Sequence, residues 1–279
     1  MTEFLTDDNV DEAKGMDAIL IRGNCAASAK NLKIFAEDYG IKYVFTRSVG
    51  YNHIDLKAAK ELGIQIARVP NYSPYAVTEL AMTLGMQLFR HTSIATTDSA
   101  AGNFKVTPNL FSKEIHSSTV GIIGAGKIGT AEARLYSGMG TKVLASDSHP
   151  SKQAAEYVEF EPLDDVLAKS DIVSVHIPYF PGENENFIDA DFLKKMKKSA
   201  ILVNTARGEI ADTKAIVEAV KNGEIAGYAG DVTVDEKDIM GHQFNSVDDI
   251  PNADVRDLAK LYPKVLLTPH MGSFTEPAL

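Results

Sequence analysis

Residues 119–140 have the sequence TVGIIGAGKIGTAEARLYSGMG, in which an apolar run leads into a helical pattern. The run is typical of a buried strand, and Gly124, Gly126 and Gly129 follow it in the spacing G-x-G-x-x-G. These glycines permit a tight turn, close approach of the backbone to a pyrophosphate, and close packing of the helix on the strand. The N-terminus of the helix adds free N–H groups and a positive dipole end. The stretch therefore predicts a dinucleotide-binding α/β fold.

The next predicted strand, 141–147, indicates which dinucleotide is bound. It ends in Asp147, an acidic residue suited to bind both hydroxyls of a ribose and to repel the extra phosphate of NADP. Lys152 follows closely, so NADP stays the second choice and NAD the first. We expect the cofactor to contact the glycine-rich turn and neighbouring strand ends, namely Gly124, Gly126, Lys127, Ile128, Gly129, Asp147, His176, Pro178, Thr205, Ala206 and Asp231.

Strand-like runs alternate with helical patterns along almost the whole chain, which predicts parallel sheets with right-handed crossovers. A first unit has strands at 17–23, 41–48 and 64–70, and a second has strands at 119–123, 141–147, 171–178, 200–206, 225–232 and 264–270. Between the units, residues 73–104 predict a long helix that begins at Ser73-Pro74. Its stripe of Leu, Met and Phe is typical of helix packing.

Polar or special residues recur where the predicted strands end. In open parallel sheets, ligands bind at the carboxyl ends of the strands, so these residues are expected to converge on one crevice between the two units. They are Arg22, Ser48 to Gly50, Tyr72, Gly124, Asp147, His176, Arg207, Asp231 and His270.

Two of these strand ends carry candidate chemistry. Arg207, in NTARG, can offer a forked guanidinium to a carboxylate or a carbonyl. His270, in TPH, becomes a general acid and base near neutral pH if a carboxylate lies beside it, and Asp231, Asp235 and Glu236 are the candidates. Taken singly, Arg207 could equally be an ion-pair partner and His270 an ordinary loop residue.

Composition excludes several other functions. A net charge of −10 disfavours nucleic acid as a partner, and no apolar run is long enough for a membrane helix. The single cysteine, Cys25, fits a reducing cytoplasm, and no metal-ligand spacing occurs, so we expect no metal.

Together GAGKIG, NTARG, DVTVDE and TPH, with TRSVGYNHID and VPNYSPYAVTEL, resemble the NAD-dependent D-2-hydroxyacid dehydrogenase family. The resemblance implies two doubly wound parallel-sheet domains with a cleft between them. A Rossmann NAD-binding domain would span residues 73–270, and a flavodoxin-like substrate domain would span 1–72 and 271–279. It further implies a homodimer. Because relatives extend beyond both ends, it implies that this chain is incomplete.

The resemblance also assigns roles to residues. His270 would be the acid and base, Glu236 its partner, and Arg207 the group that binds the substrate carboxylate and polarises its carbonyl. The backbone of Val49 and Gly50 would hold that carboxylate, and Tyr72 would line the substrate pocket.

The substrate expected from the resemblance is a small 2-oxo acid or 2-hydroxy acid. AILIRGNC is similar to the branch that acts on 2-hydroxyglutarate, and Arg22 could pair with a second carboxylate of such a substrate. D-lactate and aromatic or branched 2-hydroxy acids are the alternatives. Some relatives are NAD-sensing corepressors, so a binding protein without enzymatic activity is a further alternative.

Overall fold

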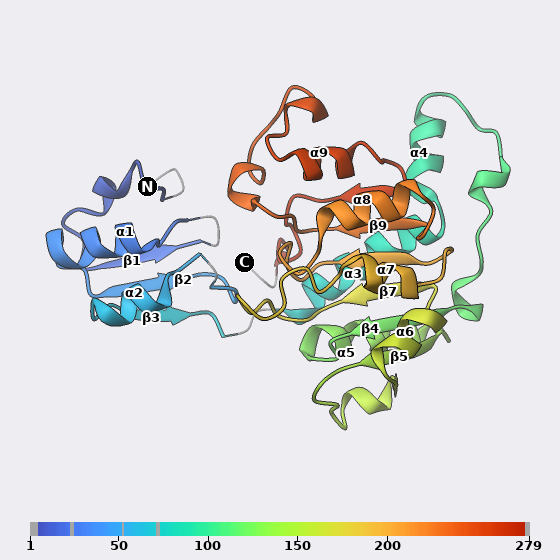
Figure 1. The fold of residues 1–279 in the computed structure, drawn as a ribbon, viewed down its shortest axis with the longest axis horizontal. Helices are drawn as coiled ribbons and strands as arrows, with labels where there is room; N and C mark the ends of the chain where they lie inside the picture. The colour runs from blue at the N-terminus through green and yellow to red at the C-terminus, as the bar shows by residue number, and fades with distance from the viewer. Residues whose placement is uncertain (1–4, 23–24, 52, 71–72, 277–279) are drawn as a thin grey trace. The chain divides into compact units, whose positions relative to one another are not determined.

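The computed structural model describes residues 5–22, 25–51, 53–70 and 73–276 (Figure 1). Its contacts divide the chain into two compact units, Met1–Tyr72 and Ser73–Leu279. The described part of the C-terminal segment, residues 271–276, is grouped with the second unit. Assigning residues 271–279 to a substrate-binding domain stays a prediction, as does the role of each unit.

The smaller unit is a parallel sheet with strand order β1-β2-β3 in its described residues. Two short helices begin where a side chain caps their first N–H groups: Ser28 accepts from Asn31, and Asp55 accepts from Ala58. Buried apolar side chains such as Leu32, Phe35 and Val44 form its core. The elements are η1 (Val10–Ala13), β1 (Ala18–Ile21), α1 (Ala29–Lys33), the π-helical turn η2 (Ile34–Asp38), β2 (Tyr43–Thr46), α2 (Leu56–Glu61) and β3 (Gln65–Arg68).

The larger unit is built on a parallel sheet with strand order β10-β9-β8-β7-β4-β5-β6 in the described residues. The chain runs outward from β4 to β6, then returns to the other side of β4 and continues from β7 to β10. The order therefore reverses between β4 and β7, which is where open α/β sheets bind their ligands. The strands are β4 (Thr119–Ile123), β5 (Lys142–Ser146), β6 (Glu159–Phe160), β7 (Ile172–Val175), β8 (Ile201–Asn204), β9 (Gly227–Gly230) and β10 (Val265–Leu267).

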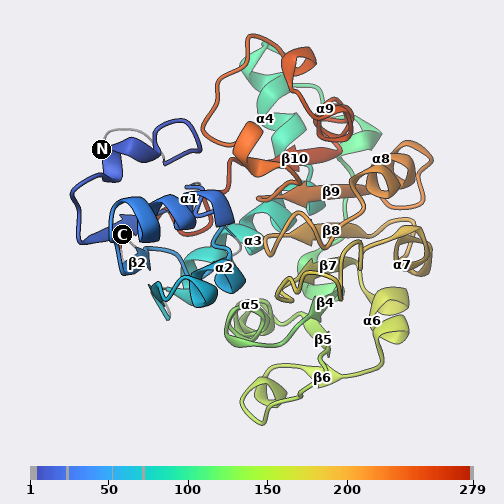
Figure 2. The same cartoon turned by 60° about the vertical axis from the view of Figure 1, so that its left-hand side comes forward.

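Helices cover both faces of this sheet (Figure 2). One face packs on α3 and α5 through residues such as Leu84 and Tyr136, and the other packs on α6, α7 and α8. The α-helices are α3 (Pro74–Phe89), α4 (Thr92–Ala100), α5 (Lys127–Gly138), α6 (Leu163–Lys169), α7 (Ala190–Lys195), α8 (Thr213–Lys221) and α9 (Ala253–Ala259). Shorter 3₁₀ turns are η3 (Pro108–Leu110), η4 (Ile115–Ser117), η5 (Ala154–Glu156), η6 (Glu236–Asp238) and η7 (Val247–Asp249).

The structure corrects two expectations about elements. The long helix predicted over 73–104 is two helices, because the chain breaks at His91, whose φ of +54° no α-helix contains. Strand β6 was not predicted, since a strand of two residues leaves no alternating pattern. The mixed α/β fold with parallel sheets is confirmed. No helix in the part of the chain that the structure describes is long and apolar enough to cross a membrane.

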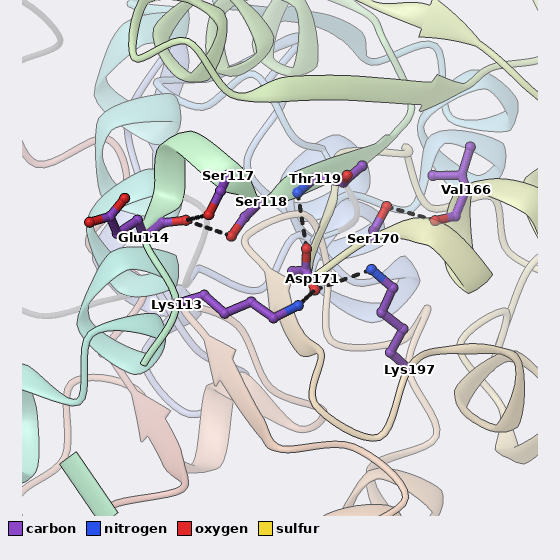
Figure 3. Close-up of polar contacts among 9 residues, drawn as sticks. All are labelled: Lys113, Glu114, Ser117, Ser118, Thr119, Val166, Ser170, Asp171 and Lys197. Atoms are coloured by element: carbon purple, nitrogen blue, oxygen red, sulfur yellow. Dashed lines mark hydrogen bonds and ion pairs between the residues drawn. The ribbon is translucent and has the colours of Figure 1, made fainter. Parts of the chain in front are cut away.

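A buried carboxylate holds the amino edge of the larger sheet together (Figure 3). Asp171, just before β7, accepts hydrogen bonds from the N–H of Thr119 at 3.0 Å, and from the ammonium groups of Lys113 at 2.9 Å and Lys197 at 3.1 Å. Burial alone would raise the pKa of Asp171, but the Thr119 N–H and the two ammonium groups outweigh burial and lower it. This cluster lies at the opposite end of the strands from the candidate site.

Candidate active site

The glycine-rich turn after β4 has the geometry that a bound pyrophosphate requires. Gly124 has a φ of +92°, and a Cβ on it would lie 3.0 Å from the backbone of His176. A Cβ on Gly129 would lie 2.1 Å from the carbonyl oxygen of Gly124. At Gly126, which caps α5, a Cβ would meet no atom within 4 Å, so a ligand can approach the backbone there. The turn therefore fits a dinucleotide phosphate at the start of α5.

The other predicted residues of this turn and of the next strand lie beside it. Lys127 and Ile128 form the first residues of α5, and the Ile128 carbonyl accepts a hydrogen bond from the Thr78 hydroxyl at 3.0 Å. Asp147 follows β5, the neighbour of β4, and its Oδ1 accepts from the N–H of His149 at 2.7 Å. This places a carboxylate at the carboxyl edge, one strand away from the glycine turn.

His176 follows β7, and its imidazole points into the protein interior. The Nε2 atom lies 2.5 Å from Oε2 of Glu132 and 3.1 Å from the hydroxyl of Ser174. The side chains of His176 and Glu132 are 1% and 0% exposed. In contrast, Pro178 is exposed, and its carbonyl accepts from Asn184. A contact of His176 with the cofactor can therefore come from its backbone more readily than from its ring.

Asn204, the last residue of β8, shapes the loop that carries Arg207. Its Oδ1 accepts from the N–H of Ala206 at 3.0 Å, and its Nδ2 donates to the carbonyl of Arg207 at 2.9 Å. Arg207 donates from Nη1 to the Ala206 carbonyl at 2.6 Å. Thr205 is buried with a hydroxyl that has no hydrogen-bond partner in the described residues, which fits a group that binds a ligand.

Asp231, at the end of β9, fixes the loop that carries His270. Its buried carboxylate accepts three hydrogen bonds, from the Thr268 hydroxyl at 2.6 Å and from the N–H groups of Met271 at 2.9 Å and Gly272 at 2.8 Å. His270 lies between these partners and has a φ of +52°, a conformation that is uncommon for a residue with a side chain. The three bonds hold the backbone of this loop on both sides of His270.

His270 and Glu236, which are predicted to act as an acid–base pair, are in contact. Nδ1 of His270 lies 2.8 Å from Oε2 of Glu236, whose Oε1 accepts from the N–H of Thr233 at 3.3 Å. The hydrogen bond to Glu236 raises the pKa of His270, and this effect exceeds the opposing effects of burial and of Arg207. Asp235, the competing carboxylate, instead accepts from the side chain of Asn252 at 2.7 Å. Of the three candidate carboxylates, Glu236 is the one that contacts the imidazole.

In the smaller unit, the predicted substrate residues follow β1 and β2. Arg22 is exposed directly after β1. The carbonyl of Val49 accepts from Arg68 at 2.8 Å, and that of Gly50 accepts from the Ser48 hydroxyl at 2.6 Å. These bonds order the loop, and within the described residues neither the N–H of Val49 nor that of Gly50 has an acceptor. Tyr72 lies outside the described residues.

Sequence reasoning missed four residues that position these groups. Asn204 and Thr268 belong to the motifs NTARG and TPH, and this position within the motifs is the feature from which their positioning roles could have been predicted. Arg68 lies in neither of these two motifs, so its contact with the Val49 carbonyl could not be predicted in this way. Glu132 is a carboxylate on the buried face of α5, four residues before the buried Tyr136, and this break in an apolar face could have drawn attention to it.

Comparison with known proteins identifies the family. Residues 82–272 match the model of the D-isomer specific 2-hydroxyacid dehydrogenase, NAD binding domain. The chain belongs to the NAD-dependent D-2-hydroxyacid dehydrogenase family. This D-2-hydroxyacid dehydrogenase family member is thus an oxidoreductase with NAD as its cofactor, as expected from its motifs.

Its relatives match all or nearly all of the chain. A 2-hydroxyacid dehydrogenase homolog of Zymomonas mobilis is 39% identical, over 100% of this chain and 84% of that protein. An aromatic 2-oxoacid reductase of Clostridium sporogenes is 36% identical, over 96% of this chain and 80% of that protein. The structure of D-lactate dehydrogenase with NAD+ from Lactobacillus jensenii matches with a TM-score of 0.81 and 37% identity, over 100% of this chain and 83% of that one.

Proposed function

We propose that this dehydrogenase interconverts a small 2-oxo acid and its D-2-hydroxy acid, with His270 as general acid and base. The observation that carries the proposal is the contact of His270 with Glu236, at the same sheet edge as the glycine-rich turn and Arg207. A raised imidazole pKa favours the protonated form of His270, which is the form that reduction needs.

The proposed reaction follows from the contact between Nδ1 of His270 and Glu236, which leaves Nε2 for the substrate. When bound, NADH supplies the hydride that reaches C2 of the 2-oxo acid. Because Nδ1 of His270 is held by Glu236, Nε2 is the atom that donates a proton to the carbonyl oxygen. The guanidinium of Arg207 would stabilise charge that develops on that oxygen and would pair with the substrate carboxylate. In the oxidation of the hydroxy acid, neutral His270 accepts the proton.

The residues of the smaller unit would select the substrate. We propose that the N–H groups of Val49 and Gly50 bind the substrate carboxylate and that Tyr72 lines the pocket. Arg22 is exposed, and within the described residues its side chain makes no hydrogen bond, so its guanidinium could pair with a distal carboxylate. On this ground 2-oxoglutarate is the proposed substrate. The names of the relatives make pyruvate and aromatic 2-oxo acids the second candidates.

The kcat/KM values for 2-oxoglutarate, pyruvate and phenylpyruvate, measured by NADH absorbance, test the substrate. A charge-assisted hydrogen bond contributes about 1.5–3 kcal/mol, so Arg22→Ala should lower kcat/KM for 2-oxoglutarate about tenfold or more. Its kcat/KM for pyruvate should stay unchanged. Lys42→Ala, an exposed cation before β2 in the same unit, is the control and should change neither value. Unaltered 2-oxoglutarate turnover in Arg22→Ala would exclude the distal-carboxylate role.

We also propose a homodimer, formed through the outer surface of α3 and the segment 104–111, which we call the arm. The arm exposes Phe104, Val106 and Phe111 at 80%, 91% and 83%. Figure 1 shows this segment after α4, outside the layers of the sheet and its helices. Beside it, α3 contributes a shallow concavity lined by Glu79, Met82, Thr83, Met86, Gln87 and Arg90. Exposed apolar side chains next to an apolar concavity are typical of a protein interface.

Sedimentation velocity tests the dimer directly. The double variant Phe104→Ser/Phe111→Ser should sediment as a monomer, whereas Phe180→Ser, an exposed aromatic change elsewhere in the same unit, should not alter the dimer. A wild-type chain that sediments as a monomer contradicts the proposal.

We propose that the enzyme is located in the cytoplasm, a reducing compartment, because its single cysteine allows no internal disulfide.

A further inference from the structure

The buried pair Glu132–His176 has no role in the proton transfer described above. Glu132 lies on α5, behind the glycine-rich turn, and its carboxylate is fully buried. Its Oε2 lies within hydrogen-bond distance of Nε2 of His176, while its Oε1 has no partner among the described residues. Burial of a carboxylate with an unsatisfied oxygen is unfavourable, and apolar replacements of buried ion pairs are often neutral or stabilising. Stability alone therefore does not explain Glu132.

The backbone of His176 contacts the glycine-rich turn. Its N–H donates to the carbonyl of Ile123 at 2.8 Å, and its carbonyl group packs directly against Gly124, where a Cβ would lie 3.1 Å from the oxygen. The peptide of His176 thus forms the wall against which the phosphate-binding turn rests. Ser174, two residues earlier on the same face of β7, contacts the same Nε2 atom at 3.1 Å.

We propose that Glu132 is a positioning residue for the dinucleotide, which it serves by anchoring His176 and thereby the turn at Gly124. The carboxylate ties α5, whose first residues offer N–H groups to the pyrophosphate, to the end of β7, whose peptide supports the turn. The contact between Glu132 and His176 then fixes the positions of both the start of α5 and the peptide that follows β7. The nucleotide meets a preformed turn and does not have to order it on binding.

The test measures NADH binding to the apoprotein by fluorescence, together with the free energy of unfolding without cofactor. Small displacements of a binding group change affinity strongly, so Glu132→Leu should raise the Kd for NADH about tenfold. The free energy of unfolding of this variant should fall, because the substitution removes one partner of a buried pair, and NADH affinity is therefore measured under conditions where the variant is folded. Glu132→Gln keeps an oxygen that accepts from His176 and should restore the Kd to within about threefold of wild type, because a neutral acceptor retains the geometry.

A matched control lies on the same face of α5. The hydroxyl of Tyr136 is also buried without a partner among the described residues, and Tyr136→Phe removes it without touching His176. This variant should bind NADH as the wild type does. Hydrogen exchange supplies an independent readout: the N–H groups of His176 and Gly124 should exchange faster in Glu132→Leu apoprotein and at the wild-type rate in Tyr136→Phe.

The result that overturns the proposal is wild-type NADH affinity in Glu132→Leu, whatever its stability. If that variant does not fold, Glu132→Leu/His176→Leu leaves no buried charge unpaired and permits the same measurement. The double variant should show the same loss of affinity, and wild-type affinity in it would equally contradict the role of Glu132.

Discussion

Nδ1 of His270 lies 2.8 Å from Oε2 of Glu236, although 34 residues separate them in the chain. They meet because β9 and β10 are neighbouring parallel strands, and each residue follows its strand at the same edge of the sheet. The contact gives the imidazole a raised pKa and a fixed orientation. The proposed chemistry depends on this contact, and the first prediction concerns it.

Glu236→Gln should move the pH dependence of 2-oxo acid reduction to lower pH. The hydrogen bond to the Glu236 carboxylate is the largest cause of the raised pKa of His270, and without it burial and Arg207 oppose only the effect of Asp231, so that pKa should fall relative to the wild type. Since reduction requires protonated His270, the rate should fall at a lower pH than in the wild type, with the largest loss above pH about 6.5. Asp235→Asn is the control, because Asp235 contacts Asn252 and not the imidazole. An unshifted midpoint of kcat/KM against pH would contradict the assignment of Glu236.

Asp231→Asn should lower turnover because it releases the loop around His270. An amide offers one acceptor oxygen, whereas the carboxylate serves Thr268, Met271 and Gly272. Loss of a buried hydrogen-bond acceptor costs about 1–3 kcal/mol of unfolding free energy. We expect kcat to fall about tenfold or more, because misplaced catalytic groups lose much of their effect. Denaturant unfolding and steady-state kinetics measure both; a variant with wild-type kcat would show that the loop does not need this clamp.

Gly126→Ala should leave the fold intact and weaken NADH binding. A Cβ at Gly126 meets no protein atom within 4 Å, and its φ of −71° suits any residue. The added methyl group would meet the phosphate, and such overpacking costs about 1–3 kcal/mol, so Kd should rise about tenfold or more. Gly138→Ala, on the exposed end of the same helix, is the control: it should raise stability by about 0.5–1 kcal/mol. Its NADH affinity should equal that of the wild type, and equal affinity in Gly126→Ala would count against a phosphate there.

Asp171→Asn should destabilise the larger unit in a pH-dependent way. The folded-state pKa of Asp171 is lowered, so its contribution is present above the unfolded value of about 3.9 and disappears as pH falls through the folded pKa. At pH 7 the variant should lose about 1.5–3 kcal/mol of unfolding free energy, the usual range for charge-assisted hydrogen bonds. The difference should shrink toward acid pH. Asp191→Asn, which removes an exposed carboxylate, should have no measurable effect, and a loss of the same size there would remove the basis for the prediction.

Much of this fold could be predicted from the sequence because buried parallel strands are apolar runs that end in polar residues. The runs that became β4, β5 and β7 to β10 have that form, and their order placed Arg207, Glu236 and His270 at one edge. The break between α3 and α4 could not be predicted, since His91 adopts a positive φ without a glycine or proline to signal it.

The parts of the site that escaped prediction depend on long-range contacts. The cofactor contact expected of Asp231 stays a prediction. The contacts of its carboxylate with the backbone N–H groups of Met271 and Gly272 could not be predicted, because no side-chain pattern marks such donors. Glu132 lies 44 residues from His176, so their contact exists only once α5 has packed on the sheet. Residue type and spacing indicated which groups carry the chemistry, whereas the supporting contacts required the folded chain.

The central claim is that His270 transfers the proton, and comparison of His270→Ala with wild type tests it most directly. Turnover of 2-oxo acid at saturating NADH and the Kd for NADH are measured on the same preparations. General acid catalysis contributes about 10²–10⁴-fold, so turnover should fall at least a hundredfold while NADH binding is retained. Near-normal turnover in His270→Ala would contradict the mechanism.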